Sequence, residues 1–219
     1  MPYSLEQRRA FQQVMLHVRA SSARVVGFTA ADRGAGVTCF AEGFAALAGS
    51  VNIKTLLIAG QPAEPKGDWA EVKSFYSRPS SDLTSLSPYL GVFAADSSSF
   101  GEVGRTRQFV EEHRSSYELI VFDLPPVLGL SEVNPFSVGA VCDAVFLICR
   151  LGQTTLPRLA RATRLMRQSQ VNLVGVVANS YGYETPGQEI ANAANRLAPI
   201  APRLARWISR RALESDLMN

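Results

Sequence analysis

Six short apolar runs divide the chain and constrain its fold more than any other feature. They are rich in β-branched residues and lie at 24–29, 55–59, 90–94, 119–123, 144–149 and 173–179. Runs of this kind are typical of strands that helices cover on both faces. Helical spacing between the runs, at 38–50, 104–115 and 156–170, predicts the covering helices. The pattern predicts an α/β fold with a doubly wound, mostly parallel sheet.

The size of the chain favours one globular core. Its 219 residues, 47% of them hydrophobic, predict a single domain over 1–219, with an N-terminal helical segment at 1–23 and a basic amphipathic tail at 196–219. No stretch approaches the roughly 18 apolar residues of a membrane span. Between 61 and 88 the sequence is rich in Pro, Ser and charge, which predicts a long excursion after the second strand.

Charge and cysteine usage indicate a cytoplasmic setting without nucleic acid. Lys and Arg number 22 against 19 Asp and Glu, and a net charge of +3 is too small to indicate nucleic-acid binding. The N-terminus lacks the apolar block of a secretory signal. The three cysteines lie in apolar runs without metal-ligand spacing, so we expect buried, reduced thiols.

A glycine-rich turn follows the first predicted strand and opens a helix. Gly34 and Gly36 let successive backbone N–H groups converge on phosphate oxygens, which the positive end of the following helix also attracts. A phosphate loop also needs a Lys and then a Ser or Thr. Thr38 is present, but Val37 occupies the Lys position. Taken alone, the turn is equally compatible with a phosphate loop and with an ordinary strand-to-helix connection.

From residue 6 to about 183 the sequence resembles the cytoplasmic domain of the bacterial tyrosine kinases of capsule and exopolysaccharide machinery (Wzc, CpsD and CapB type), within the MinD/ParA group of P-loop proteins. The most specific match is the run Val-Phe-Asp-Leu-Pro-Pro at 121–126. The loop at 29–39 resembles the family's phosphate loop apart from its missing Lys. The resemblance implies a P-loop NTPase-like fold and an adenine contact for Asn179.

The same resemblance exposes departures in the nucleotide site. The family's second acidic motif is neutral here, with Ala59 and Gln61 at its carboxylate positions. Arg33 is the nearby cation that would compensate for the missing Lys, and Asp123 is a remnant that either organises magnesium through water or caps its strand. We identify no confident catalytic residue. The degenerate nucleotide-binding set implied by the resemblance is Arg33, Gly34, Gly36, Val37, Thr38, Ala59, Gln61, Asp123 and Asn179, with Thr38 and Asp123 as the remaining metal candidates.

Both ends of the chain carry candidate contact surfaces. In the family an N-terminal E-x-x-R-x-x-R helix packs into a neighbouring subunit, and here Glu6, Arg9 and Gln12 stand at those positions. The Glu6 and Arg9 pair is otherwise an ordinary surface pair. Near the C-terminus, apolar residues share a helical face opposite Arg203, Arg206 and Arg210, and these are Leu204, Trp207 and Ile208. Such a helix lies on anionic lipid, docks on a partner or packs on its own domain.

The departures favour a pseudokinase that scaffolds or regulates capsule or exopolysaccharide polymerisation and export. Its implied partner is a membrane-spanning co-polymerase of the Wzz/CpsC-like kind, with homo-oligomers also expected. The location would be cytoplasmic, at the inner face of the membrane through that partner. No cofactor is expected, and ATP or ADP with Mg²⁺ enters only if residual binding persists. The alternatives are a weakly active ATP-binding tyrosine autokinase or ATPase and a MinD-like membrane-positioning protein.

Overall fold

The chain forms two compact units, Met1–Asn179 and Ser180–Asn219. The computed structural model describes residues 3–59, 84–94, 100, 102–131, 133–180, 183, 186–196 and 201–213. The division differs from the single domain expected from the sequence. In the second unit two helices pack on each other.

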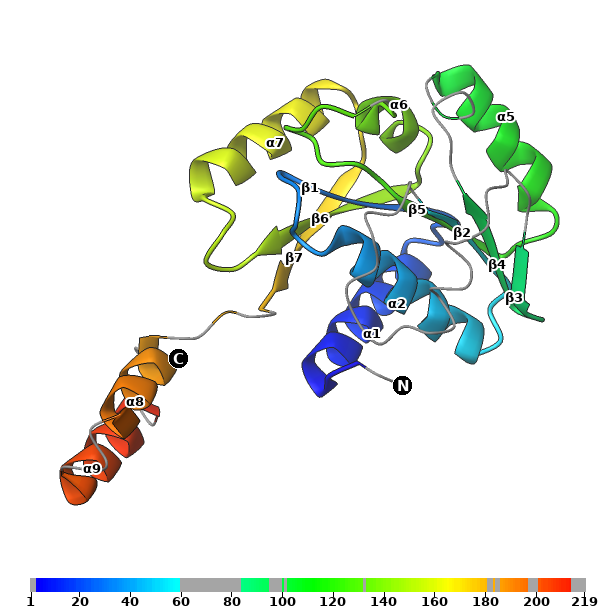
Figure 1. The fold of residues 1–219 in the computed structure, drawn as a ribbon. Helices are drawn as coiled ribbons and strands as arrows, with labels where there is room; N and C mark the ends of the chain where they lie inside the picture. The colour runs from blue at the N-terminus through cyan, green and yellow to red at the C-terminus, as the bar shows by residue number, and fades with distance from the viewer. Residues whose placement is uncertain are drawn as a thin grey trace. The chain divides into compact units, whose positions relative to one another are not determined.

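A seven-stranded sheet forms the centre of the first unit (Figure 1). In chain order its strands are β1 (Val25–Ala30), β2 (Thr55–Ala59), β3 (Thr84–Ser87), β4 (Leu90–Ala94), β5 (Leu119–Asp123), β6 (Ala144–Arg150) and β7 (Leu173–Asn179). Their order across the sheet is β3-β4-β2-β5-β1-β6-β7. All neighbours are parallel except β3, which pairs antiparallel with β4. The predicted α/β, doubly wound, mostly parallel fold is confirmed.

Helices cover both faces of this sheet (Figure 1). On one face lie α1 (Leu5–Ala20) and α2 (Val37–Ser50), and on the other lie α5 (Val103–Arg114), the short α6 (Pro135–Gly139) and α7 (Leu156–Gln168). Helix α1 begins with a capping box, in which the Ser4 hydroxyl accepts from the Gln7 N–H and the Gln7 side chain accepts from the Ser4 N–H. The predicted N-terminal helical segment is therefore present.

Two hydrophobic clusters, one on each face, hold the layers together. Phe28 of β1 is fully buried beneath α2 and contacts the rings of Phe40, Phe44 and Phe146. On the opposite face, β1 contributes Val25 to a cluster that α5, α6 and α7 complete. Because β1 is buried along its whole length, the packed sheet fixes the start of the glycine-rich loop that follows it.

The second unit is a pair of helices, α8 (Pro186–Arg196) and α9 (Pro202–Leu213). The Ser209 hydroxyl of α9 donates to the Ala191 carbonyl, 3.1 Å away, and lies 3.1 Å from Asn195 Oδ1. Helix α9 begins at Pro202, because proline is tolerated in the first turn of a helix but not further in. None of the described helices is long and apolar enough to cross a membrane.

Candidate nucleotide site

The carboxyl ends of four strands bring the candidate site together. Strands β5, β1, β6 and β7 are consecutive in the sheet and parallel, so their last residues meet at one edge. Those residues are Asp123, Ala30, Arg150 and Asn179. Ligands of open α/β sheets bind at this edge, beside the strand where the order reverses. In this sheet that strand is β1, which leads into the glycine-rich loop.

The loop at 31–36 has the backbone conformation that its glycines permit. Gly34 and Gly36 adopt positive φ angles of 81° and 91°, and Gly36 is the residue from which α2 starts. No backbone carbonyl in the described part of the chain accepts from the N–H groups of residues 34–38. Their N–H groups and the positive end of α2 are the elements that attract anions in phosphate loops.

Two positions that the resemblance aligns with charged residues of the family carry apolar side chains where the structure describes them. Val37, at the Lys position, is partly buried and packs against the hydrophobic cluster beneath α2. Ala59, at the first carboxylate position, is buried with 1% of its surface exposed. Gln61 lies outside the described residues. The Val37 side chain therefore packs against the core at the position that the resemblance aligns with the loop Lys.

Thr38 and Asp123, the two metal candidates, are joined directly. The Thr38 hydroxyl donates to Asp123 Oδ2 over 2.8 Å, which links the first turn of α2 to the end of β5. No group of three or more potential metal-ligating side chains is present among the described residues. A hydroxyl and one carboxylate would hold Mg²⁺ only together with nucleotide phosphates and waters, which supply the remaining oxygens of its octahedral shell.

Two side chains from neighbouring strands bind the carbonyls of the loop. Arg150 Nη1 donates to the Gly34 carbonyl over 3.1 Å, and Asn179 Nδ2 donates to the Ala35 carbonyl over 2.8 Å. The Asn179 amide also occupies the space above Gly36, where an added Cβ would lie 2.5 Å from Nδ2. The role that the resemblance gives Asn179 is an adenine contact, whereas in this structure its amide holds the loop.

Two more arginines, one on α7 and one in the loop itself, form bonds in this region. Arg158 of α7 forms a two-bonded ion pair with Asp32, with its Nε 2.7 Å from Oδ2 and its Nη2 on Oδ1. Hydrogen bonding from Arg158 lowers the pKa of Asp32, and the guanidinium charge lowers it further. Arg33, the predicted compensating cation, donates to the Leu130 carbonyl over 2.9 Å.

Sequence reasoning missed Arg150 and Arg158. Arg150 carried a usable signal, because it ends a strand at the same edge as Asp123. Arg158 carried no such signal, because it is one of several regularly spaced arginines on α7, and this spacing predicts a helix face that is exposed to water.

The cysteine of this region is not an activated nucleophile. Cys142 and Cys149 are buried as expected, but the expectation is wrong for Cys39, which is exposed at the start of α2. Partial desolvation raises the pKa of the Cys39 thiol, and the negative charges of Glu42 and Asp123 raise it further. The neutral thiol is therefore favoured at physiological pH.

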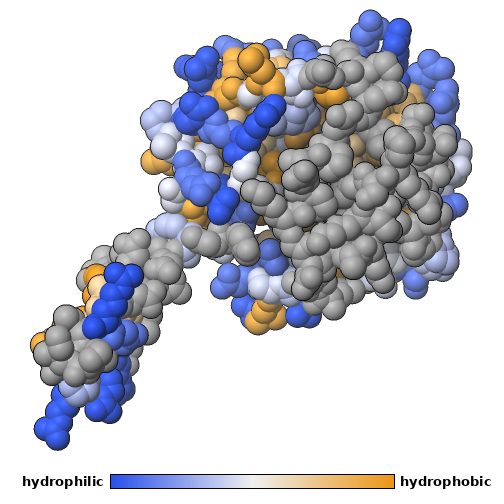
Figure 2. All heavy atoms as spheres, viewed as in Figure 1, coloured by the Kyte–Doolittle hydropathy of each residue, from blue (hydrophilic) through white to orange (hydrophobic). Residues whose placement is uncertain are grey.

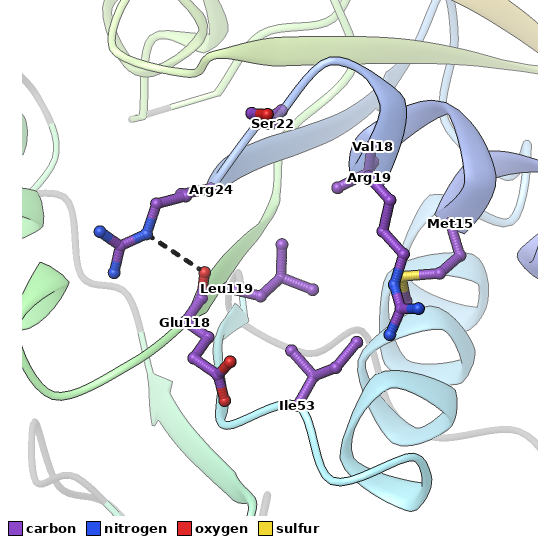
Figure 3. Close-up of a pocket in the computed structure, with 9 residues that line it drawn as sticks. Met15, Val18, Arg19, Ser22, Arg24, Ile53, Glu118 and Leu119 are labelled. Carbon is purple, nitrogen blue, oxygen red and sulfur yellow. Dashed lines mark hydrogen bonds between the residues drawn. The ribbon is translucent and has the colours of Figure 1, made fainter.

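A separate hollow of about 460 Å³ lies at the opposite, amino edge of the sheet (Figure 3). Its lining includes the apolar side chains of Met15, Val18, Ile53 and Leu119 and three charged residues, which are Arg19, Arg24 and Glu118. Arg24 and Glu118 directly precede β1 and β5, so this hollow lies at the end of the sheet opposite to the glycine-rich loop.

Comparison with known proteins gives matches in sequence and in structure. No family model matches the chain. Tyrosine-protein kinase etk of Escherichia coli (strain K12) is 29% identical over 75 residues, which are 34% of this chain and 10% of the kinase. The matched segment is thus about a tenth of the relative's length.

The structural matches cover most of this chain. The kinase domain of E. coli tyrosine kinase ETK superposes with a TM-score of 0.59 at 20% identity, covering 76% of this chain and 72% of that one. The chimerical protein CapA2B2 gives 0.62 at 16% identity, over 82% and 86% of the two chains. The chain has the fold of a bacterial tyrosine-kinase domain. MinD of Aquifex aeolicus shares this kinase-like fold, with a TM-score of 0.54 at 15% identity over 86% and 87% of the two chains.

The resemblance to bacterial tyrosine kinases inferred from the sequence is thereby confirmed. The three residues predicted to contact a neighbouring kinase-like subunit, Glu6, Arg9 and Gln12, are exposed on the outer side of α1. Exposure makes them accessible to another chain, and their role as an oligomer contact stays a prediction.

Proposed function

We propose that the chain is a pseudokinase that scaffolds or regulates the polymerisation and export of capsule or exopolysaccharide. The observation that carries the proposal is the filling of the charged positions by core side chains. Val37 packs into the cluster beneath α2, and Ala59 is buried at the end of β2. Phosphoryl transfer depends on positive charge and magnesium around the phosphates, so the loss of the loop Lys and of the carboxylate at position 59 removes a large part of the catalysis.

The residues present fit a magnesium nucleotide only in part. The loop amides and Thr38 suit phosphate oxygens, and MinD of Pyrococcus horikoshii, which shares the fold with a TM-score of 0.52, is known as a complex with Mg-ADP. The absence of a Lys amine at position 37 and of a carboxylate at position 59 does not suit a magnesium nucleotide. We therefore assign no catalytic step to a nucleotide, and expect none as a cofactor of the working protein.

If the chain is a scaffold, its function depends on its contact surfaces and not on the glycine-rich loop. The outer side of α1 is the surface that the kinase resemblance links to subunit contacts, and it exposes Glu6, Arg9 and Gln12. The expected partners are a second copy of the chain and a membrane-spanning polysaccharide co-polymerase of the Wzz/CpsC-like kind. Through that partner the chain would lie at the inner face of the cell membrane.

Calorimetric titration of the full chain with Mg-ATP and Mg-ADP tests the proposal. The loss of one charge-assisted contact to phosphate costs about 1.5–3 kcal/mol, which is roughly a 10 to 150-fold loss of affinity. We expect no binding, or binding well above the micromolar range. Submicromolar binding of Mg-ATP by the unmodified chain would contradict the proposal.

A weakly active ATP-binding autokinase or ATPase is the second candidate. The hydrogen bond between Thr38 and Asp123 favours it, because these are the two groups that would face a magnesium ion. It predicts slow, magnesium-dependent release of phosphate that Asp123→Asn abolishes. The pseudokinase predicts no phosphate release above that of the Asp123→Asn variant.

A further inference from the structure

Helix α9 combines exposed apolar and basic side chains in a way that the kinase-like unit does not require. Leu204 and Trp207 are 53% and 65% exposed. Four arginines of the same helix are exposed, at 203, 206, 210 and 211. No acidic residue occurs between Pro202 and Leu213. Figure 2 shows hydrophobic and strongly hydrophilic atoms side by side on this part of the chain.

The packing of α8 fixes which side of α9 is turned outward. Ser209 contacts α8 through its bonds to Ala191 and Asn195. With 3.6 residues per turn, Leu204 and Trp207 lie about 140° and 160° from Ser209 around the axis of α9. The contact with α8 therefore leaves these two side chains on the far side of α9.

The basic residues form a stripe beside this apolar side. By the same helical geometry Arg203, Arg206 and Arg210 lie about 60–120° from Ser209, and Trp207 borders them. Arg211 lies about 160° from Ser209, between Trp207 and Leu204, so its charge stands within the apolar side. Trp at the boundary between a basic and an apolar stripe is the arrangement of helices that lie in the interface of a bilayer. The arginine stems extend along the apolar surface while their guanidinium groups reach lipid phosphates.

We propose that α9 binds the surface of bilayers that contain anionic phospholipid, with Leu204 and Trp207 inserted among the headgroups and the arginines on the lipid phosphates. Charge complementarity selects this occupant, since α9 presents four positive charges and no negative one. The apolar side chains distinguish it from a purely electrostatic contact. The contact is peripheral, and it depends on neither the loop nor a co-polymerase, so it goes beyond the proposed function.

The test is flotation of the purified full chain with two kinds of vesicle, one of phosphatidylcholine and one of phosphatidylcholine mixed with phosphatidylglycerol. We expect at least about ten-fold stronger binding to the anionic vesicles, and a decrease as salt is raised. Arg203→Gln and Arg206→Gln should each weaken binding about five-fold. Leu204→Glu and Trp207→Glu should reduce it to the level seen with neutral vesicles.

Helix α7 provides matched controls. It also exposes a leucine, Leu156, and a stripe of arginines that includes Arg161 and Arg164. Leu156→Glu and the pair Arg161→Gln with Arg164→Gln should leave vesicle binding unchanged. Circular dichroism of every variant checks that the helices are retained.

Fluorescence reports insertion directly. In a Trp69→Phe background, Trp207 is the remaining tryptophan of the chain. We expect its emission to shift to the blue on anionic vesicles, and lipids brominated in the acyl chain to quench it.

Three results would overturn the proposal, and none of them bears on the pseudokinase. They are equal binding to neutral vesicles, loss of binding in the α7 variants to the same degree as in the α9 variants, and absence of a shift in Trp207 emission. Capture of an acidic protein by α9 with no vesicle binding would replace the bilayer with that protein.

Discussion

Arg158 of α7 binds Asp32 through both of its facing nitrogens, and this ion pair connects the glycine-rich loop to a helix 126 residues further along the chain. Both side chains are partly exposed, at 51% for Arg158 and 29% for Asp32. Water therefore screens the pair, and its main effect is to orient the loop.

The first prediction concerns the pH dependence of this pair. Arg158 lowers the pKa of Asp32 in the folded chain below its unfolded value of about 3.9. The pair therefore stabilises the fold above that pH, and the contribution is lost as the pH falls through the lowered pKa. We expect Asp32→Asn to melt at a slightly lower temperature than the unmodified chain at pH 7, and the difference to shrink below pH 4.

Thermal melts of both proteins between pH 7 and pH 3 measure this difference. Glu102→Gln is the control, because Glu102 forms a looser exposed pair with Arg105 at 3.8 Å. A difference for Asp32→Asn that stays constant down to pH 3 would show that the ion pair is not its origin.

The second prediction separates two costs of adding a side chain to the loop. Gly34→Ala should destabilise the fold by about 1–2 kcal/mol, because its φ is positive while the space around it is open. Gly36→Ala should cost about 1–3 kcal/mol more, since its Cβ would overlap the Asn179 amide. Asn179→Ala, combined with Gly36→Ala, should recover that excess. Urea unfolding of Gly36→Ala, Asn179→Ala and the double variant, with Gly34→Ala for comparison, gives the coupling free energy between positions 36 and 179. Additive effects of the two substitutions would contradict the contact between Gly36 and the Asn179 amide.

The third prediction is that Val37→Lys alone does not create a kinase. The new amine should raise affinity for Mg-ATP about ten-fold or more, but Ala59 still provides no carboxylate for magnesium. The variant should also lose about 1 kcal/mol of stability, because Val37 packs against the core. Assays of autophosphorylation and calorimetry measure both properties. Tyrosine phosphorylation by this single variant would refute the degenerate-site interpretation.

The fourth prediction compares the loop with the surface of α1 in cells. Asp123→Asn should leave polysaccharide yield nearly unchanged, because the proposed function uses no phosphoryl transfer. Arg9→Glu should lower it, because it places a second negative charge near Glu6 on the surface proposed for subunit or partner contact. Yields are compared at equal protein level, with partner pull-down as a second measurement. The opposite pattern would favour retained nucleotide chemistry.

Much of the sheet could be predicted because buried parallel strands have short apolar sequences. Four of the strands, β2, β4, β5 and β7, have the predicted bounds, while β1 and β6 differ by one residue. Strand β3 was not predicted, since the run Thr-Ser-Leu-Ser has little apolar character. Helix α8 was also missed, because small and amide residues dominate its sequence.

The prediction for β7 was correct in bounds and wrong in environment. Its apolar run predicts a strand covered on both faces, but β7 is the edge of the sheet, and Val176 is 52% exposed. The hydropathy of a segment depends on its own residues and not on the strands beside it, so it cannot distinguish an edge strand from a central strand of the sheet. For the same reason the contacts of Asn179 and Arg150 with the loop, which join distant segments, could not be read from spacing.

The position of β1 between β5 and β6 has a consequence for how the chain folds during synthesis. The Thr29 hydroxyl of β1 bonds to the Pro125 carbonyl, 96 residues later, and the Val25 N–H bonds to Asp143, 118 residues later. The last bond of the loop, from Asn179 to Ala35, spans 144 residues. Strand β1 is therefore synthesised before the other strands of this sheet, but it acquires its partners only after β5 and β6 have been translated. During that interval its apolar edges are open to aggregation, and chaperones that bind extended apolar segments should recognise β1 before any later strand.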